Sequence, residues 1–427
     1  MAMRFVNRVD ELKRLEQKKR KFSVLFGRRR VGKTSLIEHW NSSEPIFYSQ
    51  AIEASEFQQI QQIMEDFRDV LPEGLTASSW TELFPILSLI SKNCVLVFDE
   101  FPYLVRTEKS LPSQMQRWID HKQPNGVSLM VLGSSQTMMS GIFLSSSSPL
   151  YERADQIIHL EPMSYSHFCE AVELDPLDSK SFETFSLVGG VPKYWSYIEK
   201  DWNSCRVADE LYFRKGAYLE SEPDRLLKDE DINGLQAKAI FEALGRGAHK
   251  PSEIANRLGI KQTGLSKPIN ILLQTSLVTR SLPFGENIRS SKKILYNIKD
   301  HALEFWYGTF SPHRSRWHLY NNQEKKKLIH DHASKILEKS YRDLFPDGER
   351  YWDGKENEFD CVRLADASGK NLIVSEITHK NLSKKEQKQI STKLEEKFSH
   401  SKLSSNYNLA KTEALGIIEV LEQLVKE

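Results

Sequence analysis

The stretch VLFGRRRVGKTSLI, residues 24–37, decides the fold of this chain. It predicts a short apolar strand, a loop bounded by glycines and the start of a helix. Gly27, Gly32, Lys33 and Thr34 satisfy the spacing G-x-x-x-x-G-K-[ST]. Glycines let the loop turn its N–H groups toward phosphate oxygens, and the helix N-terminus that follows favours negative charge. A chance match in a surface turn is the alternative, and the flanking strand and helix argue against it.

The motif also predicts what individual side chains of the loop do. Lys33 would lie along the β- and γ-phosphates, and the Thr34 hydroxyl would ligate Mg²⁺. We therefore expect ATP and Mg²⁺ as ligands. The predicted nucleotide-binding set of this loop is Gly27, Arg30, Val31, Gly32, Lys33, Thr34 and Ser35. The neighbouring arginines, residues 28–30, could face phosphates, although solvent or an adjacent domain is the expectation we favour.

Length and composition set the broad class of the protein. The chain has 427 residues, enough for two or three domains, with 39% hydrophobic and 27% charged residues. Its net charge of +1 means that any binding to nucleic acid must come from a local patch. The four cysteines are scattered, which suits a reducing compartment and neither a disulfide framework nor a zinc site. With no long apolar run, we expect a cytoplasmic protein without a membrane partner.

Strand-like and helix-like segments alternate through residue 160. The expected strands are residues 24–26, 45–48, 94–98, 127–132 and 157–160, with amphipathic helices between them. This alternation predicts an α/β fold with a doubly wound parallel sheet. In such sheets, ligands bind outside the carboxyl ends of the strands.

Polar residues follow two of these strands directly. Asp99 and Glu100 end the apolar run 94–98, so we predict that Asp99 is associated with Mg²⁺ and that Glu100 polarises the attacking water. A helix cap or a solvated turn is the alternative. Ser134 follows strand 127–132 and is predicted to sense the γ-phosphate, unless this serine cluster is an ordinary turn. All of these residues fall on the same edge of the predicted sheet.

Together these residues resemble the archaeal-type ATPases of the AAA+/STAND branch of P-loop NTPases. The resemblance covers about residues 4–200 and implies roles for further side chains. Asn7 and Arg8 would lie near the adenine, Pro192 would approach the nucleotide from a helical lid, and Arg153 would be an arginine finger or form a salt bridge inside the lid. The motifs that carry the resemblance are Phe5-x-Asn7-Arg8-x-x-Glu11-Leu12-x-x-Leu15, Gly27 to Thr34, Phe98-Asp99-Glu100, Gly133-Ser134-Ser135, Pro149-Leu150-Tyr151-Glu152-Arg153 and Gly189-Gly190-Val191-Pro192.

Residues 236–300 have the periodicity of a winged helix-turn-helix. Helices are expected around 239–244, 251–259 and 262–276, followed by a wing within 279–298. DNA binding is one interpretation, and a protein-binding or intramolecular module is the other. Net neutrality and Pro268 inside the expected reading helix count against DNA. The side chains expected to face a major groove are Lys261, Gln262, Thr263, Ser266, Lys267 and Asn270.

The C-terminal part is similar to PD-(D/E)XK nucleases, which follow an F-W segment in the same ATPase group. The resemblance implies that Asp360 and Glu376, on adjacent strands, hold Mg²⁺, with Glu338 on a preceding helix. Thr378 occupies the position where such nucleases need a lysine, and Lys380 lies one pleat further along. We therefore expect a degenerate nuclease-like domain that is inactive or impaired.

The predicted organisation is a P-loop ATPase core (1–165), a helical lid (166–232), a winged helix-turn-helix (233–310) and a nuclease-like domain (311–427). We expect an ATPase that acts as a nucleotide-dependent switch for DNA or a protein partner. The alternative is an ATP-gated DNA nuclease with its Mg²⁺ site at Asp360 and Glu376. A third interpretation holds ATP as a structural ligand that never turns over. An oligomer would allow Arg153 to act in a neighbouring subunit.

Overall fold

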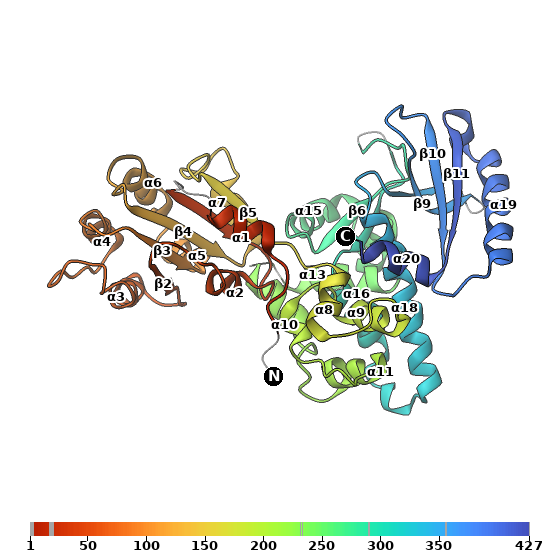
Figure 1. The fold of residues 1–427 in the computed structure, drawn as a ribbon, viewed down its shortest axis with the longest axis horizontal. Coiled ribbons are helices and arrows are strands. Elements are labelled where there is room, and N and C mark those ends of the chain that lie inside the picture. Colours follow the sequence, from red (N-terminus) through yellow and green to blue (C-terminus); the bar gives the residue numbers. More distant parts are fainter. Residues whose placement is uncertain are drawn as a thin grey trace. The chain divides into compact units, whose positions relative to one another are not determined.

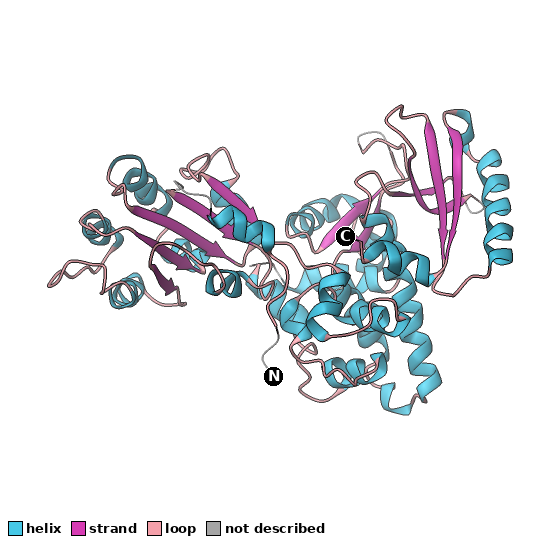
Figure 2. Ribbon diagram, in the orientation of Figure 1, coloured by secondary structure: helices cyan, strands magenta, loops and turns pink. Residues whose placement is uncertain are grey.

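The structure is a computed structural model, and it describes residues 4–16, 21–230, 232, 234–288, 291–354 and 357–426. The chain forms two compact units. The first unit holds residues 7–162 together with 228–232, and the second holds residues 1–6, 163–227 and 233–427. Figure 1 follows the chain through its elements, and Figure 2 separates helices from strands.

The first unit is built on a parallel sheet with the strand order β2-β3-β4-β1-β5. Every residue of β1 and β3 is buried, as expected for strands that are covered on both faces. The predicted α/β parallel sheet is therefore confirmed. β1 and β4 are adjacent in the sheet. The connection from β1 leads toward β2 at one end of the sheet, and the connection from β4 leads to β5 at the other end. Ligands bind where connections diverge in this way, at the carboxyl ends of the strands. The strands are β1 Phe22–Phe26, β2 Ile46–Gln50, β3 Cys94–Asp99, β4 Val127–Gly133 and β5 Gln156–His159.

Helices flank this sheet (Figure 2) and bury their apolar stripes against it. Aromatic rings form the centre of one layer: Phe98 of β3 packs edge-on against Phe67 and Trp80, with ring centroids 5.3 and 5.9 Å apart. The helices are α1 Val9–Glu16, α2 Lys33–Glu38, α3 Glu56–Asp66, α4 Trp80–Leu87, α5 Phe101–Thr107, α6 Leu111–His121 and α7 Gln136–Phe143.

The second unit begins with a helical region that shares one hydrophobic core with helices later in the chain. Phe182, Trp195, Ile336 and Leu421 are members of one buried cluster, so residues 163–227 pack with C-terminal helices of the same unit. The predicted domain boundaries stay a prediction. The helices of this region are α8 Tyr165–Val172, α9 Ser179–Val188, α10 Pro192–Trp195, α11 Ser204–Ala208, the π-helical turn η1 Asp209–Phe213 and α12 Glu222–Asp229.

Three helices and an antiparallel strand pair follow. The strands β6 and β7 pair Val278 with Ile298 and Ser281 with Leu295. The sequence places Pro268 inside the third helix, expected around 262–276. That helix begins at Ser266, so Pro268 lies in its first turn, where the missing N–H is not needed. The elements are α13 Gly234–Gly245, α14 Pro251–Leu258, the 3₁₀ turn η2 Gln262–Leu265, α15 Ser266–Gln274, β6 Val278–Ser281 and β7 Leu295–Ile298.

The remainder is an α/β arrangement around a four-stranded mixed sheet of order β11-β10-β9-β8. β10 is antiparallel to β9 and parallel to β11, and β8 is antiparallel to β9. The 22-residue helix α18 precedes the sheet, and Asn321 caps it with a capping box to Glu324. The elements are α16 His301–Phe305, η3 Trp306–Phe310, α17 Ser311–His313, η4 Trp317–Leu319, α18 Asn322–Asp343, β8 Glu349–Trp352, β9 Glu358–Leu364, β10 Asn371–Ile377, α19 Lys384–His400, η5 Lys402–Ser405, β11 Asn408–Leu415 and α20 Ile417–Leu424.

Among the residues that the structure describes, no helix combines the length and the apolar content that crossing a membrane requires.

Candidate nucleotide-binding site

The loop between β1 and α2 needs glycine at both ends for different reasons. A Cβ atom at Gly27 would lie 2.4 Å from the carbonyl oxygen of Leu160, so no side chain fits there. Gly32 precedes α2 with φ +102°, a left-handed conformation that glycine adopts without steric cost. Arg30 also has a positive φ of +69°. Val31 is fully buried, and Ser35 lies in the first turn of α2.

Lys33 is buried and points back across this loop. Its Nζ atom donates hydrogen bonds to the carbonyl oxygens of Gly27 at 2.9 Å and Arg28 at 3.2 Å. Burial lowers the pKa of Lys33, and the nearby carboxylates of Glu100 and Asp99 act in the opposite direction. The ammonium group is thus held inside the loop, beside the acids that end β3.

Asp99, the last residue of β3, contacts the start of α2 and the neighbouring strand β2. The Thr34 hydroxyl donates to Asp99 Oδ2 at 3.3 Å, and the Tyr48 hydroxyl of β2 donates to the same oxygen. Burial and Asp99 raise the pKa of Tyr48, which keeps its hydroxyl a donor. Sequence analysis missed Tyr48, because only the pairing of β2 with β3 brings it to this position.

Glu100 occupies a conformation that few non-glycine residues adopt. Its φ is +53°, and it precedes α5. The Ser134 hydroxyl, at the end of β4, donates to Glu100 Oε1, and the Glu100 N–H donates to Asp99 Oδ1 at 2.7 Å. The side chains predicted to hold Mg²⁺, to polarise water and to sense the γ-phosphate therefore lie together at the carboxyl edge.

Arg8, in the N-terminal segment, forms hydrogen bonds that hold the loop in place. Its guanidinium donates to the backbone oxygens of Val31 at 3.2 Å and Glu161 at 2.7 Å and pairs with Glu11 at 3.0 Å. Arg8 and its neighbour Asn7 both have positive φ angles, +64° and +57°. The contacts give Arg8 a clear part in shaping the loop, whereas contact of either residue with adenine stays a prediction.

Asp229 and Glu230, from a segment distant in sequence, contact this edge of the sheet. Glu230 accepts hydrogen bonds from the backbone N–H groups of Gln136 at 3.0 Å and Thr137 at 3.2 Å, at the N-terminus of α7. Asp229 pairs with Arg29 of the nucleotide loop at 2.7 Å. The pairing gives Arg29 a partner within the protein. Neither acid was found from sequence, because nothing local indicates where this segment returns.

Glu230 predicts a pH-dependent stability. Burial raises its pKa above the ordinary 4.5. The folded protein then keeps the proton at a pH where the unfolded chain releases it, so Glu230 stabilises below pH 4.5 and this contribution is lost as the pH rises through the folded-state pKa. We expect Glu230→Gln to lack this decrease in stability with rising pH. Thermal unfolding from pH 4 upward measures it, with the exposed Glu73→Gln as control. Parallel pH profiles of the parent and Glu230→Gln would contradict the assignment.

Arg153 lies at the other edge of the same sheet. It precedes β5, and its Nε atom pairs at 3.0 Å with Oδ1 of Asp120, which precedes β4. Both residues are therefore at the amino ends of the strands, away from the phosphate loop of their own chain. A finger role at the nucleotide of a neighbouring subunit stays a prediction.

Pro192 is the buried first residue of α10 in the second unit, and its predicted approach to the nucleotide also stays a prediction.

The acids of the C-terminal sheet form a second cluster. Ser375 pairs with Cys361 in the antiparallel ladder, so Glu376 of β10 and Asp360 of β9 follow side by side. Asp360 Oδ2 accepts from the N–H of Ile377 at 2.8 Å. Burial raises the pKa of both carboxyls, and burial together with Asp360 raises that of Glu338 on α18 to about 7. Crowded acids of this kind favour a cation as partner.

A lysine stands beside this cluster at a place that the sequence pattern did not indicate. Lys397 of α19 has its Nζ atom 3.8 Å from Glu376 Oε2. The N–H of Thr378 bonds to the carbonyl oxygen of Leu415, and Lys380 is exposed. Lys397 of α19, like Arg342 of α18, whose Nη1 atom lies 4.0 Å from Glu338 Oε2, therefore approaches the acids from a helix and not from positions 378 or 380, which follow β10.

Comparison with known proteins agrees with the geometry of the first unit. Residues 5–198 match the family model of an ATPase domain that occurs predominantly in Archaea. This match confirms the predicted resemblance at the level of the domain, and it supports ATP binding and hydrolysis. It does not extend to the remainder of the chain.

A relative also matches most of the chain. An uncharacterized protein of Methanocaldococcus jannaschii is 28% identical over 415 residues, which are 90% of this chain and 90% of that protein. Among solved structures, a Walker-type ATPase of Pyrococcus abyssi aligns with a TM-score of 0.49 and 17% identity, over 70% of this chain and 94% of that one. The ORC2 protein of Aeropyrum pernix aligns with a TM-score of 0.41 and 11% identity, over 77% and 94%.

Proposed function

We propose that the chain is a P-loop ATPase that works as a nucleotide-dependent switch. The observation that carries this proposal is the meeting of Lys33, the Thr34–Asp99 pair and the Glu100–Ser134 pair on one edge of the parallel sheet. A cation, a hydroxyl–carboxylate pair and a second carboxylate are the groups that phosphoryl transfer to water requires.

The proposed chemistry assigns one task to each of these groups. Lys33 neutralises the charge that develops between the β- and γ-phosphates, and Glu100 orients a water in line and accepts its proton. The Thr34 and Asp99 oxygens, 3.3 Å apart, are hard ligands of the kind that Mg²⁺ binds. Bound there, Mg²⁺ would add positive charge at the phosphates. Ser134, through its contact with Glu100, reports the nucleotide state.

The module α13–α15 with the strand pair β6–β7 is the proposed output of the switch, as a DNA-binding winged helix. Residues 259–276 contain no acidic side chain. Their buried side, including Leu265, Ile269 and Leu272, anchors the helix. The side chains predicted to face a major groove are all exposed: Lys261, Gln262, Thr263, Ser266, Lys267 and Asn270. Phe284 between the strands is buried against the C-terminal sheet, and its N–H donates to the carbonyl oxygen of Arg350 at 2.9 Å, so the reading helix is the proposed contact.

Reversal of two charges tests this output. In Lys261→Glu/Lys267→Glu we expect duplex DNA affinity to fall about tenfold or more, with a shallower salt dependence, because each phosphate contact contributes to both. Fluorescence anisotropy in ATP and in ADP measures it, and this variant should lose the difference between nucleotides that the parent shows. Lys109→Glu/Lys122→Glu, at exposed positions of the first unit, matches the charge change and should bind as the parent does. Equal affinity of the first variant and the parent would defeat the DNA interpretation.

An ATP-gated nuclease is the second candidate function, and Lys397 favours it. A lysine 3.8 Å from Glu376 supplies the cation that Thr378 does not. Such a site would need Asp360 and Glu376 to bind Mg²⁺. Incubation of plasmid DNA with ATP and Mg²⁺ or Mn²⁺ distinguishes the two functions. For a switch alone we expect no cleavage above that of Asp360→Ala, and cleavage lost in Asp360→Ala would replace the switch by the nuclease.

A further inference from the structure

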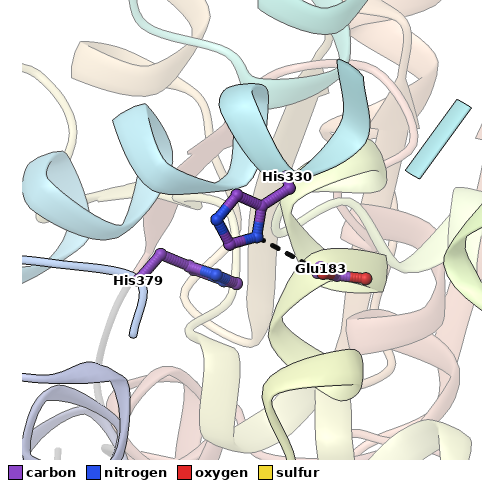
Figure 3. Close-up of side chains that lie close together, drawn as sticks. All are labelled: Glu183, His330 and His379. Atoms are coloured by element: carbon purple, nitrogen blue, oxygen red, sulfur yellow. Dashed lines mark ion pairs between the residues drawn. The ribbon is translucent and has the colours of Figure 1, made fainter. Parts of the chain in front are cut away.

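Three side chains of the kinds that bind metal ions meet in the second unit. Glu183 belongs to α9, His330 to α18, and His379 to the segment after β10. One ligand atom of each residue lies within 4.8 Å of those of the other two. Figure 3 shows the three side chains converging from these separate elements. No motif spacing in the sequence connects positions 183, 330 and 379.

His379 provides the strongest indication that something binds here. The residue is only 8% exposed, and neither ring nitrogen has a hydrogen-bond partner among the described residues. Burial and the neighbouring His330 lower the pKa of His379 to about 4, so the ring is neutral at physiological pH. A buried polar ring without partners is costly, and a neutral imidazole is the form that binds a metal.

The other two side chains keep the site accessible and oriented. His330 Nδ1 lies 3.9 Å from Glu183 Oε1, and these side chains are 40% and 22% exposed. The second carboxylate oxygen of Glu183 accepts a hydrogen bond from the Ser204 hydroxyl at 2.8 Å. Outer contacts of this kind orient metal ligands. The partial exposure of His330 gives an ion a path into the site.

The helices that carry the ligands are held in fixed register. Two residues after His330, the Nε2 atom of His332 contacts the carbonyl oxygen of Ser186 on α9 at 2.9 Å. Phe182, which precedes Glu183, is fully buried, and its ring centroid lies 6.3 Å from that of His379. The packed backbone therefore holds the three side chains near one another. Ligand atoms around tetrahedral Zn²⁺ are about 3.3 Å apart. The three ligand atoms here lie within 4.8 Å of one another, so the side chains must move closer together when the ion binds.

We propose that Glu183, His330 and His379 bind a divalent transition-metal ion, Zn²⁺, which ties α9 and α18 to the end of β10. Two imidazole nitrogens and one carboxylate oxygen suit Zn²⁺, whereas Mg²⁺ prefers six oxygen ligands. Three protein ligands leave a fourth position for water. The site is independent of the proposed nucleotide chemistry, because all three ligands belong to the second unit.

Metal binding by the full chain, without nucleotide or Mg²⁺, tests this site. We expect metal-free protein to take up one equivalent of Zn²⁺ in competition with a chromophoric chelator and to unfold at a higher temperature with the ion bound. His330→Ala and His379→Ala should lose that equivalent, and His318→Ala, at an exposed position outside the site, should keep it. No uptake by the parent, or an equivalent retained by His379→Ala, would overturn the proposal.

Cobalt spectroscopy distinguishes a lost ligand from a damaged fold. His379→Cys keeps a ligand at the same position, so we expect it to bind one Co²⁺ and to add a sulfur-to-metal charge-transfer band that the parent lacks. His318→Cys should add none. A Co²⁺ complex of His379→Cys without that band would show that residue 379 is not a ligand, and the proposal would be wrong.

Discussion

Replacement of Lys33 by alanine is expected to abolish ATP binding. Lys33 is 6% exposed, and its Nζ atom lies within the loop, 2.9 Å from the carbonyl oxygen of Gly27. Charge-assisted hydrogen bonds contribute about 1.5–3 kcal/mol each. Losing two of them to phosphate oxygens weakens binding by roughly 100-fold or more. Titration with a fluorescent ATP analogue in Mg²⁺ measures this loss directly.

The control for Lys33→Ala is Lys109→Ala, an exposed lysine of the same unit. It removes the same charge and should leave ATP affinity within about twofold of the parent. Circular dichroism shows whether both variants remain folded. ATP affinity in Lys33→Ala equal to that of the control would mean that the loop of residues 27–34 does not hold the phosphates.

Glu100→Gln is expected to separate ATP binding from ATP hydrolysis. The amide has the size of the carboxylate and still accepts a hydrogen bond from Ser134, but it cannot take the proton of the attacking water. Turnover should fall by about 10²–10⁴-fold, the usual contribution of a general base. ATP affinity should stay close to that of the parent, because Lys33 and the Thr34–Asp99 pair are unchanged.

Phosphate release at saturating ATP measures the turnover of this variant, and isothermal titration measures its affinity. Glu73→Gln, at an exposed position of the same unit, removes one carboxylate elsewhere and should hydrolyse ATP at the parental rate. If Glu100→Gln turned over ATP like the parent, another residue would polarise the water, and the role assigned to Glu100 would be wrong.

Local pattern was sufficient for the elements that carry the nucleotide loop. Continuous apolar runs predicted β1 and β3, because strands covered on both faces cannot alternate. The spacing of glycines and lysine predicted the loop. A side chain at position 27 would collide with the backbone of Leu160, and the left-handed conformation at position 32 favours glycine. Asp99, Glu100 and Ser134 were then placed together, since the carboxyl ends of parallel strands share an edge.

Residues brought in from a distance could not be predicted in this way. Tyr48 reaches Asp99 only because β2 is the edge strand beside β3. Glu230 caps α7 from a segment about 90 positions further along the chain. Arg153 pairs with Asp120 of another element at the amino edge, a partner that no local pattern indicates. Strand order and returning segments are non-local, so a single sequence carries no signal for them.

Conversion of bound ATP in a single turnover tests most directly whether this chain hydrolyses ATP. Excess protein is mixed with γ-labelled ATP and Mg²⁺, and bound nucleotide and free phosphate are followed in the same sample. We predict that the parent converts its bound ATP to ADP and phosphate, whereas Glu100→Gln retains ATP. Stoichiometric ATP that the parent holds for hours without conversion would contradict this prediction and would make ATP a structural ligand.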